Sequence, residues 1–340
     1  MGGPLLKGVM VGAGFFARFQ AEAWKRIEGV ELAAVADPLP GRAAAFAAEF
    51  GIARSYTDAA AMLASEMADF ADIVTRPESH RELTELAAQH CRAVICQKPM
   101  APTWEDCQAM VTLCSHRGVR LLIHENWRWQ PWYREARRLI SQDRLGRVFH
   151  FGFRMRTGDG RGSAPYPVQP YFREMPRLLL YETAVHFLDT FRFLGGELES
   201  VYCQTNRVNS VIQGEDYALV QVSFAGGAKG LIDANRVSGK YPPDVAFGEF
   251  RIEGERAMIR IAADGYLFVT DYGTPETRLH LKFPAEGYKG DSVRALQRHF
   301  AHCLRSGEAA ESEGAAYLRT VQAVEACYRS AQTGRPVNLA

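Results

Sequence analysis

The first part of the chain alternates apolar runs rich in β-branched residues with alanine-rich, amphipathic stretches. The former predict strands and the latter predict helices. The strands expected up to residue 125 are Leu5–Val11, Val30–Ala36, Phe70–Thr75, Ala93–Cys96 and Val119–His124. The helices expected between them are Phe16–Ile27, Arg42–Phe50, Asp58–Met67, His80–His90 and Trp104–Arg117. Because strands and helices take turns with short connections, this pattern predicts a parallel sheet with helices on both faces.

The pattern changes after residue 125. A helix expected at Trp132–Ile140 is followed by a series of strands, Val148–Arg156, Ser200–Arg207, Ala218–Phe224, Gly230–Val237, Phe250–Gly254, Ala257–Ile261 and Tyr266–Val269. Glycine pairs and Asp-Gly steps between several of these runs are typical of hairpins. Two helices, Ser292–Arg305 and Gly314–Ala331, close the chain. We therefore predict an α/β protein of two domains, residues 1–125 and residues 126–340, with a large, mostly antiparallel open sheet in the second. The C-terminal helices are free to pack back on the first domain.

Composition narrows the class of protein. The chain has 340 residues, of which 47% are apolar and 23% charged, as in ordinary globular proteins of two domains. Its 40 basic and 39 acidic residues leave a formal net charge of +1, so no charge excess points to nucleic acid or a membrane surface. We see neither a signal peptide nor an apolar run of about 18 residues. The seven cysteines form no C-x-x-C pair, which indicates reduced thiols and a cytoplasmic protein.

A glycine-rich turn follows the first expected strand. Gly12, Gly14 and Ala17 have the spacing G-x-G-x-x-A, and Asp37 ends the second expected strand about 20 residues further on. Small residues permit a tight turn and let the backbone approach a pyrophosphate, while the following helix directs unpaired N–H groups at the phosphates. A glycine-rich turn beside a solvated acid is the alternative. The order of these residues favours a Rossmann domain, with a dinucleotide held by Gly12, Gly14, Phe15, Phe16 and Asp37.

Asp37 also discriminates between the two nicotinamide dinucleotides. A carboxylate accepts hydrogen bonds from the adenosine ribose hydroxyls but repels a 2′-phosphate. Arg42 lies five residues further on and offers a phosphate partner, although a solvated charge on the next helix is its simpler role. We therefore predict NAD, with NADP less favoured.

Two further segments end strands at the expected carboxyl edge of the sheet, where nicotinamide lies in such folds. One runs from Thr75 through Arg76 and Pro77 to His80, and the other is Gln97-Lys98-Pro99. A lysine just before a proline has a restricted backbone direction, which aims its ammonium group into the cleft, whereas the alternative is an ordinary surface lysine. The further cofactor contacts that we expect from these segments are Thr75, Arg76, Pro77, His80, Gln97 and Lys98.

At these residues the sequence resembles the glucose–fructose oxidoreductase, inositol dehydrogenase and rhizopine catabolism family (Gfo/Idh/MocA). The glycine turn, the Thr75–His80 segment, Lys98-Pro99, Glu182-x-x-x-His186 and the Thr333–Val337 segment occur in family order. The resemblance covers essentially the whole chain. It implies an N-terminal Rossmann domain, a C-terminal α/β domain often used for oligomerisation, and oxidation or reduction of a sugar or polyol hydroxyl with NAD or NADP.

The sequence departs from the family pattern at two places. The usual Glu-Lys-Pro is Gln97-Lys98-Pro99, so Lys98 loses an adjacent negative charge. The usual Asp-x-Gly-x-His is Glu182-x-Ala184-x-His186, which keeps a carboxylate on a longer arm. By position in these motifs, the resemblance implies catalytic roles for Lys98, Glu182 and His186.

The residue types suit the removal of a hydroxyl proton as a hydride leaves. An imidazole titrates near neutrality, so His186 can act as general base, and Lys98 can stabilise the developing alkoxide. If a helix runs there, Glu182 lies one turn before His186 on the same face, where it orients the imidazole or contacts substrate. The alternative for His186 is a structural histidine at a helix start. We expect no metal, because no cysteine cluster or H-E-x-x-H motif completes a coordination shell.

The segment from His124 to Trp132 carries three tryptophans among polar residues. Alternation along an extended segment would place Trp127 and Trp129 on one side, either as a sugar platform or as an apolar seam between domains. We expect Asn126, Trp127 and Arg128, with Lys98, Glu182 and His186, to contact substrate. CQKPMA together with HENWRWQ resembles the branch of the family that oxidises the anomeric hydroxyl of D-apiose with NAD to give a lactone.

Two other functions remain open at this point. A reductase of a keto-sugar or imino compound would use the same residues, because hydride transfer is reversible. A non-catalytic dinucleotide-binding regulator is the alternative from another class.

A large sheet with one uncovered face needs a partner, so we expect a homodimer or homotetramer.

Overall fold

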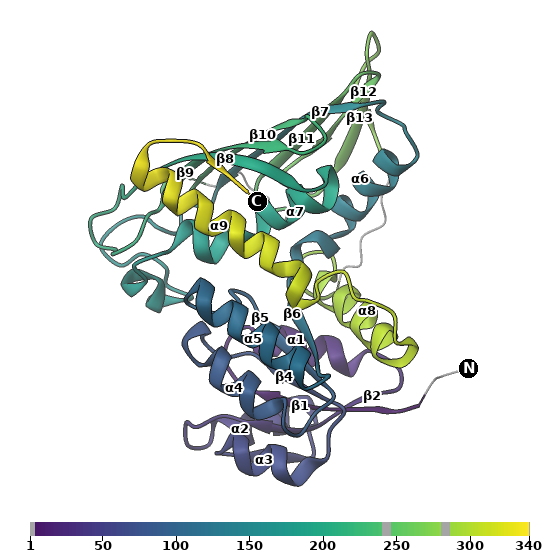
Figure 1. Ribbon diagram of the computed structural model, residues 1–340, viewed down its shortest axis with the longest axis vertical. Helices are drawn as coiled ribbons and strands as arrows, with labels where there is room; N and C mark the ends of the chain where they lie inside the picture. Colours follow the sequence, from purple (N-terminus) through teal and green to yellow (C-terminus); the bar gives the residue numbers. More distant parts are fainter. Residues whose placement is uncertain (1–3, 240–245, 280–285, 340) are drawn as a thin grey trace. The chain divides into compact units, whose positions relative to one another are not determined.

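The computed structural model describes residues 4–239, 246–279 and 286–339. The chain divides into two compact units (Figure 1). The first contains residues 4–129 and 286–319, and the second contains residues 130–239, 246–279 and 320–339. The C-terminal part of the chain therefore contributes to both units.

The first unit is built on a parallel six-stranded sheet in the order β3-β2-β1-β4-β5-β6. Its strands are β1 (Leu6–Val11), β2 (Val30–Ala36), β3 (Arg54–Tyr56), β4 (Phe70–Ile73), β5 (Ala93–Gln97) and β6 (Arg120–His124). The predicted doubly wound parallel sheet is confirmed. In such a sheet the strand order reverses between β1 and β4, so the carboxyl ends of these strands flank the place where a dinucleotide binds.

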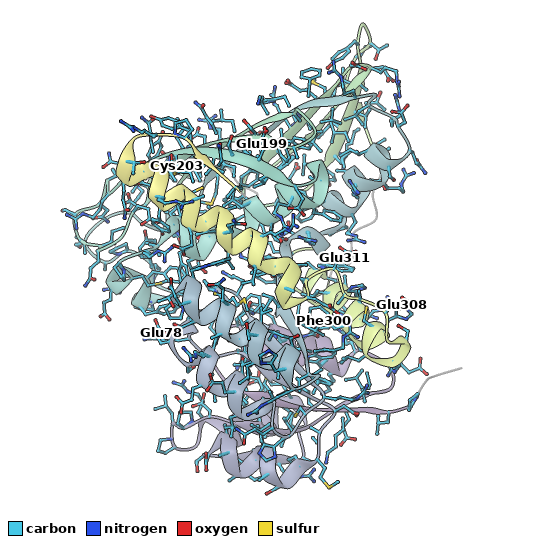
Figure 2. All side chains as sticks on the ribbon, viewed as in Figure 1. Glu78, Glu199, Cys203, Phe300, Glu308 and Glu311 are labelled. Atoms are coloured by element: carbon cyan, nitrogen blue, oxygen red, sulfur yellow. The ribbon has the colours of Figure 1, made fainter. Side chains whose placement is uncertain are left out.

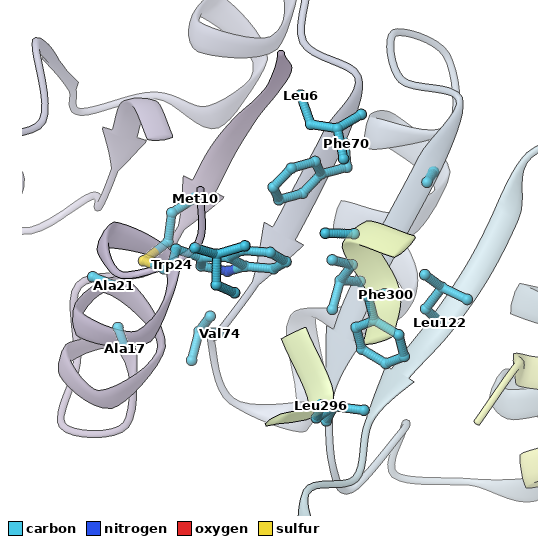
Figure 3. Packing of buried hydrophobic residues seen from close by; sticks show 14 of the residues in the cluster. Leu6, Met10, Ala17, Ala21, Trp24, Phe70, Val74, Leu122, Leu296 and Phe300 are labelled. Carbon is cyan, nitrogen blue, oxygen red and sulfur yellow. The ribbon is translucent and has the colours of Figure 1, made fainter. Parts of the chain in front are cut away.

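Helices cover this sheet, and one of them comes from far along the chain. The helices are α1 (Ala17–Lys25), α2 (Arg42–Phe50), α3 (Ala59–Glu66), α4 (His80–Ala87), α5 (Trp104–His116) and α8 (Ser292–Ser306). α8 carries Phe300 (Figure 2), and its buried face joins Leu296 and Phe300 to a core that also contains Trp24, Phe70 and Leu122 (Figure 3). α8 thus completes the apolar layer over α1 and the sheet.

The second unit contains a nine-stranded sheet in the order β14-β13-β12-β11-β7-β10-β9-β8-β15. Its strands are β7 (Val148–Arg156), β8 (Leu198–Asn206), β9 (Tyr217–Phe224), β10 (Lys229–Asn235), β11 (Glu249–Gly254), β12 (Ala257–Ile261), β13 (Leu267–Asp271), β14 (Thr277–Arg278) and β15 (Val337–Asn338). β7 and β10 pair in parallel, and the other neighbours are antiparallel. The predicted large, mostly antiparallel sheet is therefore confirmed.

One face of this sheet is covered by helices. α6 (Pro131–Ser141) and α7 (Val185–Gly195) belong to the second unit, and α9 (Gly314–Thr333) enters it at Thr320. Figure 1 shows α7 and α9 on the same face, and no helix among the described residues covers the other. Alternation along the strands follows from this: in β9, Ala218, Val220 and Val222 are buried, whereas Gln221 is exposed.

The structure also bears on membrane insertion and on the state of the cysteines. Among the described residues, no helix combines the length and the apolar character needed to cross a bilayer. All seven cysteines are free thiols and buried, including Cys203 on β8 (Figure 2). Burial raises the pKa of Cys91 to about 12 and that of Cys114 to about 11, so both stay protonated and weakly reactive near neutrality.

Candidate active site

The turn after β1 accepts no side chain at its first glycine. Gly12 has φ +102°, and a Cβ there would lie 2.5 Å from the carbonyl oxygen of Val74. Gly14 differs, because a Cβ at that position would meet nothing within 4 Å. α1 begins at Ala17, three residues after Gly14. Backbone N–H groups at the start of a helix beside an uncrowded glycine form a cradle that fits a pyrophosphate.

Asp37 follows β2 directly and is 5% exposed. Its Oδ2 accepts a hydrogen bond from the backbone N–H of Ala13 at 3.0 Å, and its Oδ1 accepts one from Leu39 at 3.0 Å. Nη1 of Arg42 lies 3.7 Å from Oδ2. Each carboxylate oxygen retains capacity for another donor, which suits ribose hydroxyls.

His80 joins the loops that follow β4 and β5. Its Nδ1 lies 3.1 Å from the carbonyl oxygen of Pro99 and 3.2 Å from that of Met100, while Nε2 lies 3.2 Å from the carbonyl oxygen of Thr75. Burial lowers the pKa of this imidazole, and the neutral ring donates through one nitrogen at a time. His80 therefore fixes the spacing of the two loops from within the protein.

The other residues of the β4 loop lie nearer the surface. Oγ1 of Thr75 lies 2.7 Å from Oγ of Ser79, Arg76 is exposed, and Pro77 begins a short 3₁₀ turn, Pro77–Ser79. A contact of Thr75, Arg76, Pro77 or His80 with a cofactor stays a prediction.

Lys98 follows the last residue of β5. Its backbone N–H donates to Oε1 of Gln97 at 2.7 Å, and Nε2 of Gln97 donates to Oε1 of Gln20 on α1 at 2.9 Å. Gln97 is 6% exposed, Lys98 is half-buried, and the Lys98–Pro99 peptide is cis. The side chain of Gln97 thus holds the backbone of Lys98 from inside the unit.

The segment after β6 differs from expectation. Trp127–Trp129 forms a 3₁₀ turn and is buried, so the predicted extended alternation of Trp127 and Trp129 is wrong. The turn forms because Oε1 of Glu125 accepts the backbone N–H of Trp127 at 3.0 Å, while Oε2 accepts the hydroxyl of Tyr317 at 3.1 Å. The ring of Trp129 packs against His299 with centroids 4.8 Å apart.

Two polar residues of this segment also have partners within the first unit. Nδ2 of Asn126 donates to Oγ of Ser292 at 2.9 Å, and Asn126 is 2% exposed. Nη1 of Arg128 lies 4.0 Å from Oε2 of Glu311, which Figure 2 labels. Substrate contacts by Asn126, Trp127 and Arg128 remain predictions.

Glu182 and His186 lie in the second unit, on either side of a change in helix geometry. Leu179–Ala184 is a π-helical turn that contains Glu182, and α7 starts at Val185, so His186 lies in its first turn. The buried carboxylate of Glu215 accepts the backbone N–H groups of Leu180 at 2.9 Å and Leu178 at 3.3 Å. Isolated π turns occur frequently at functional sites, and Glu215 anchors the start of this one.

The carboxylate of Glu182 lies beside a buried arginine. Its Oε2 accepts the hydroxyl of Thr183 at 2.6 Å and lies 3.5 Å from Nη1 of Arg236. Arg236 also donates to Oγ1 of Thr183 at 2.8 Å and to Oδ2 of Asp159 at 2.5 Å. The guanidinium thus lies between the carboxylates of Glu182 and Asp159. Oγ1 of Thr190 donates to the backbone carbonyl of His186 at 2.8 Å.

Comparison with known proteins assigns the family. The Gfo/Idh/MocA oxidoreductase family with an NAD-binding Rossmann fold matches residues 6–125, and the family's C-terminal domain matches residues 133–260. D-apiose dehydrogenase of Paraburkholderia graminis is 37% identical over 98% of this chain and 89% of its own length. The enzyme of the same name from Rhizobium rhizogenes is 35% identical over 98% and 97%.

A solved structure agrees with these relatives. An oxidoreductase from Agrobacterium radiobacter, in complex with NAD+, L-tartaric acid and magnesium, is 34% identical. It superposes with a TM-score of 0.91 over 98% of both chains. The chain belongs to the Gfo/Idh/MocA family.

Membership of the Gfo/Idh/MocA family confirms several predictions. The resemblance, the α/β fold with a Rossmann domain, the oxidoreductase class and NAD as cofactor are all confirmed. Among the described residues, no group of three or more His, Cys, Asp and Glu side chains is arranged to hold a metal ion.

The predicted site residues of this Gfo/Idh/MocA protein are divided between its units. The first unit brings together the Gly12 turn and Asp37, and places Lys98 after Gln97 at the end of β5, which pairs with β4. Glu182 and His186 belong to the second unit. Their catalytic roles stay predictions.

Sequence reasoning missed the polar residues that hold these side chains, namely Gln20, Asp72, Asp159, Glu215 and Arg236. Asp72 had a detectable signal, since it is a lone acid within the apolar strand Phe70–Ile73. The partners of Arg236 are 77 and 54 residues away along the chain, and no local pattern connects them.

Proposed function

We propose that the protein is an NAD-dependent dehydrogenase that oxidises a sugar hydroxyl, with the anomeric hydroxyl of D-apiose as the first candidate and a lactone as the product. The observation that carries this proposal is the similarity, over 98% of the chain, to two relatives named D-apiose dehydrogenase. Gln97-Lys98-Pro99 and the residues after His124 are the local features that support the same branch.

NAD fits the residues of the first unit. The cradle at Gly12 and Gly14 would hold the pyrophosphate, and Asp37 would accept the ribose hydroxyls. When bound, NAD+ supplies the acceptor for a hydride. The nearby Arg42 partly offsets the negative charge of Asp37, yet the carboxylate still disfavours a 2′-phosphate.

In the proposed reaction His186 accepts the proton of the substrate hydroxyl at an imidazole nitrogen. The ammonium group of Lys98 donates a hydrogen bond to the same oxygen and stabilises the negative charge that develops there. The side chain of Gln97 accepts a hydrogen bond from the backbone N–H of Lys98. The end of β5, rather than a surface loop, therefore determines where the side chain of Lys98 leaves the backbone.

Glu182 acts as an anion in this proposal. Arg236 lies 3.5 Å from its carboxylate and Thr183 donates to it, so proton abstraction by Glu182 would have to overcome both contacts. The carboxylate therefore accepts a substrate hydroxyl or orients His186, while His186 remains the base.

The decisive experiment measures NADH formation by purified protein with NAD+ and a panel of free sugars and polyols that includes D-apiose, repeated with NADP+. We expect turnover with a branched or simple aldose and formation of a lactone. Lys98→Ala and His186→Ala should each lower kcat by about 10²-fold or more without a comparable loss of NAD+ affinity. Tight NAD+ binding with no turnover across the panel would contradict the proposal.

The uncovered face of the second unit's sheet supports a homodimer or homotetramer. On this face alternate strand positions are partly exposed, and its apolar members are Tyr202, Tyr217, Leu219, Leu231, Met258 and Phe268. These residues form two groups, on β8–β10 and on β12–β13, with Arg154 of β7 and Arg251 of β11 between them. Partly exposed apolar side chains on one face of a sheet favour burial against a second copy. The buried, free thiols support a cytoplasmic location for the assembled protein.

A further inference from the structure

A chain of buried polar side chains leads from Lys98 into the interior of the first unit. The backbone N–H of Lys98 donates to Gln97 at 2.7 Å, and the Gln97 amide donates to Oε1 of Gln20 at 2.9 Å. Nε2 of Gln20 then donates to the carboxylate of Asp72, at 2.9 Å to Oδ1 and 3.0 Å to Oδ2. The chain therefore runs from the end of β5 across α1 to the middle of β4.

The direction of donation along this chain is determined at both ends. A backbone N–H only donates, so Oε1 of Gln97 must face Lys98. At the other end, Nε1 of Trp24, also a pure donor, contacts Oδ2 of Asp72 at 2.7 Å. The two glutamine amides between these ends consequently have one orientation in which every contact pairs a donor with an acceptor.

Asp72 is fully buried, and no cationic side chain in the described part of the chain forms an ion pair with it. Burial raises the pKa of its carboxyl group to about 7, and the hydrogen bonds from Trp24 and Gln20 oppose that rise. Above this pH the chain ends on a carboxylate anion. Trp24, which contacts this carboxylate, belongs to the apolar core on α1 (Figure 3). Bulk water therefore does not solvate the negative charge of Asp72.

We propose that Asp72, Gln20 and Gln97 act as positioning residues for Lys98, and that position 97 must be an uncharged amide because Asp72 holds the negative charge at the far end of the chain. The role of Lys98 itself rests on the proposed function. The hydrogen-bond chain explains why glutamine stands where the family usually has glutamate.

The substitution Q97E would break this arrangement. The introduced carboxylate could still accept the N–H of Lys98, but its second oxygen would face Oε1 of Gln20, placing two acceptors together. Turning the Gln20 amide would transfer the same conflict to Asp72.

A second change, D72N, removes the conflict. Gln20 then donates to the introduced carboxylate, while the introduced amide at position 72 donates to Gln20 and accepts the N–H of Trp24 at its carbonyl oxygen. The double variant therefore satisfies every group with the chain reversed at Gln20.

The test is a double-mutant cycle at pH 8 on the protein of 340 residues, with the variants Q97E, D72N and Q97E/D72N. We expect Q97E to lower Tm by about 5 °C or more, because a buried acceptor loses its donor. Q97E/D72N should recover most of that loss. Gln108→Glu, the same change at an exposed position of α5, is the control and should leave Tm unchanged within about 1 °C. A Q97E protein as stable as the unmodified one, or a double variant no more stable than Q97E, would overturn the proposal.

Activity provides a readout that stability alone would not move. With the substrate identified, Q97E should lower kcat by about 10-fold, because Lys98 is displaced, and Q97E/D72N should restore it at unchanged KM for NAD+. Restored Tm without restored kcat would refute the positioning role. The unfolding measurements need no substrate. If the proposed sugar oxidation fails, the Tm values of the variants still test the hydrogen-bond chain, so the two failures can be told apart.

Discussion

The backbone N–H of Ala13 donates a hydrogen bond to Oδ2 of Asp37 across 3.0 Å. The carboxylate that directly follows β2 thus also holds the glycine turn that follows β1. This contact couples recognition of the ribose to the shape of the pyrophosphate cradle, since a change at Asp37 alters both.

We expect Asp37→Ser to weaken NAD+ binding by about 10-fold or more, because charge-assisted hydrogen bonds are lost together with support for the turn. Affinity for NADP+ should rise relative to NAD+, since the repulsion of a 2′-phosphate disappears while Arg42 remains nearby. Titration calorimetry with both dinucleotides measures the two constants. An unchanged ratio of the two affinities would show that Asp37 does not select the cofactor.

The pKa of Asp72 predicts a pH dependence of stability. Its folded-state value, about 7, lies above the unfolded value of about 3.9, so between these limits the native state binds a proton that the unfolded state has lost. The contribution of Asp72 to the free energy of unfolding should therefore fall as the pH rises from about 4 to about 7, and then level off. Urea unfolding of the unmodified protein and of D72N across this range measures the difference, and identical pH profiles would contradict the raised pKa.

Arg236 supports the segment that carries Glu182. It is 4% exposed, contacts Asp159 and Thr183, and lies over the rings of Tyr166 and Phe172 at 4.9 Å and 5.0 Å. Arg236→Met should lower the free energy of unfolding by about 3 kcal/mol, because two carboxylates lose their partner.

The matched control for Arg236 is Arg256→Met. Arg256 pairs with Asp143 at 2.6 Å on the exposed surface, where such pairs contribute less than about 1 kcal/mol. Urea unfolding of both variants gives the comparison. Equal losses would show that the buried network contributes no more than a surface ion pair.

Leu231 tests the proposed assembly. It is 37% exposed on the uncovered face of β10. Leu231→Asp should shift the assembly toward monomers at micromolar concentration, because each copy would bury an unpaired carboxylate. Light scattering measures the mass, with Gln108→Asp at an exposed position of α5, outside the second unit, as the polar-to-charged control. A monomeric unmodified protein would refute the assembly.

Much of the secondary structure could be predicted because it depends on local periodicity. The strands Val148–Arg156 and Ala257–Ile261 have the predicted bounds, since one covered sheet face imposes alternation on their sequences. β3 was missed because its three residues, Arg54–Tyr56, contain no apolar run. The 3₁₀ turn at Trp127–Trp129 depends on contacts of Glu125 with the backbone and with Tyr317, which alternation of side chains does not reveal.

The Rossmann turn, its acid at Asp37 and the family motifs around Lys98 and His186 can be recognised in the sequence, because each depends on residues that are close together in the chain or at the ends of regular elements. The pairing of buried polar groups, in contrast, becomes visible in the folded protein. Gln20 reaches Gln97 across 77 residues, and Glu182 reaches Arg236 across 54. The physical reason is that a buried polar group must find its partner wherever packing places one, and packing joins elements that are remote in the sequence.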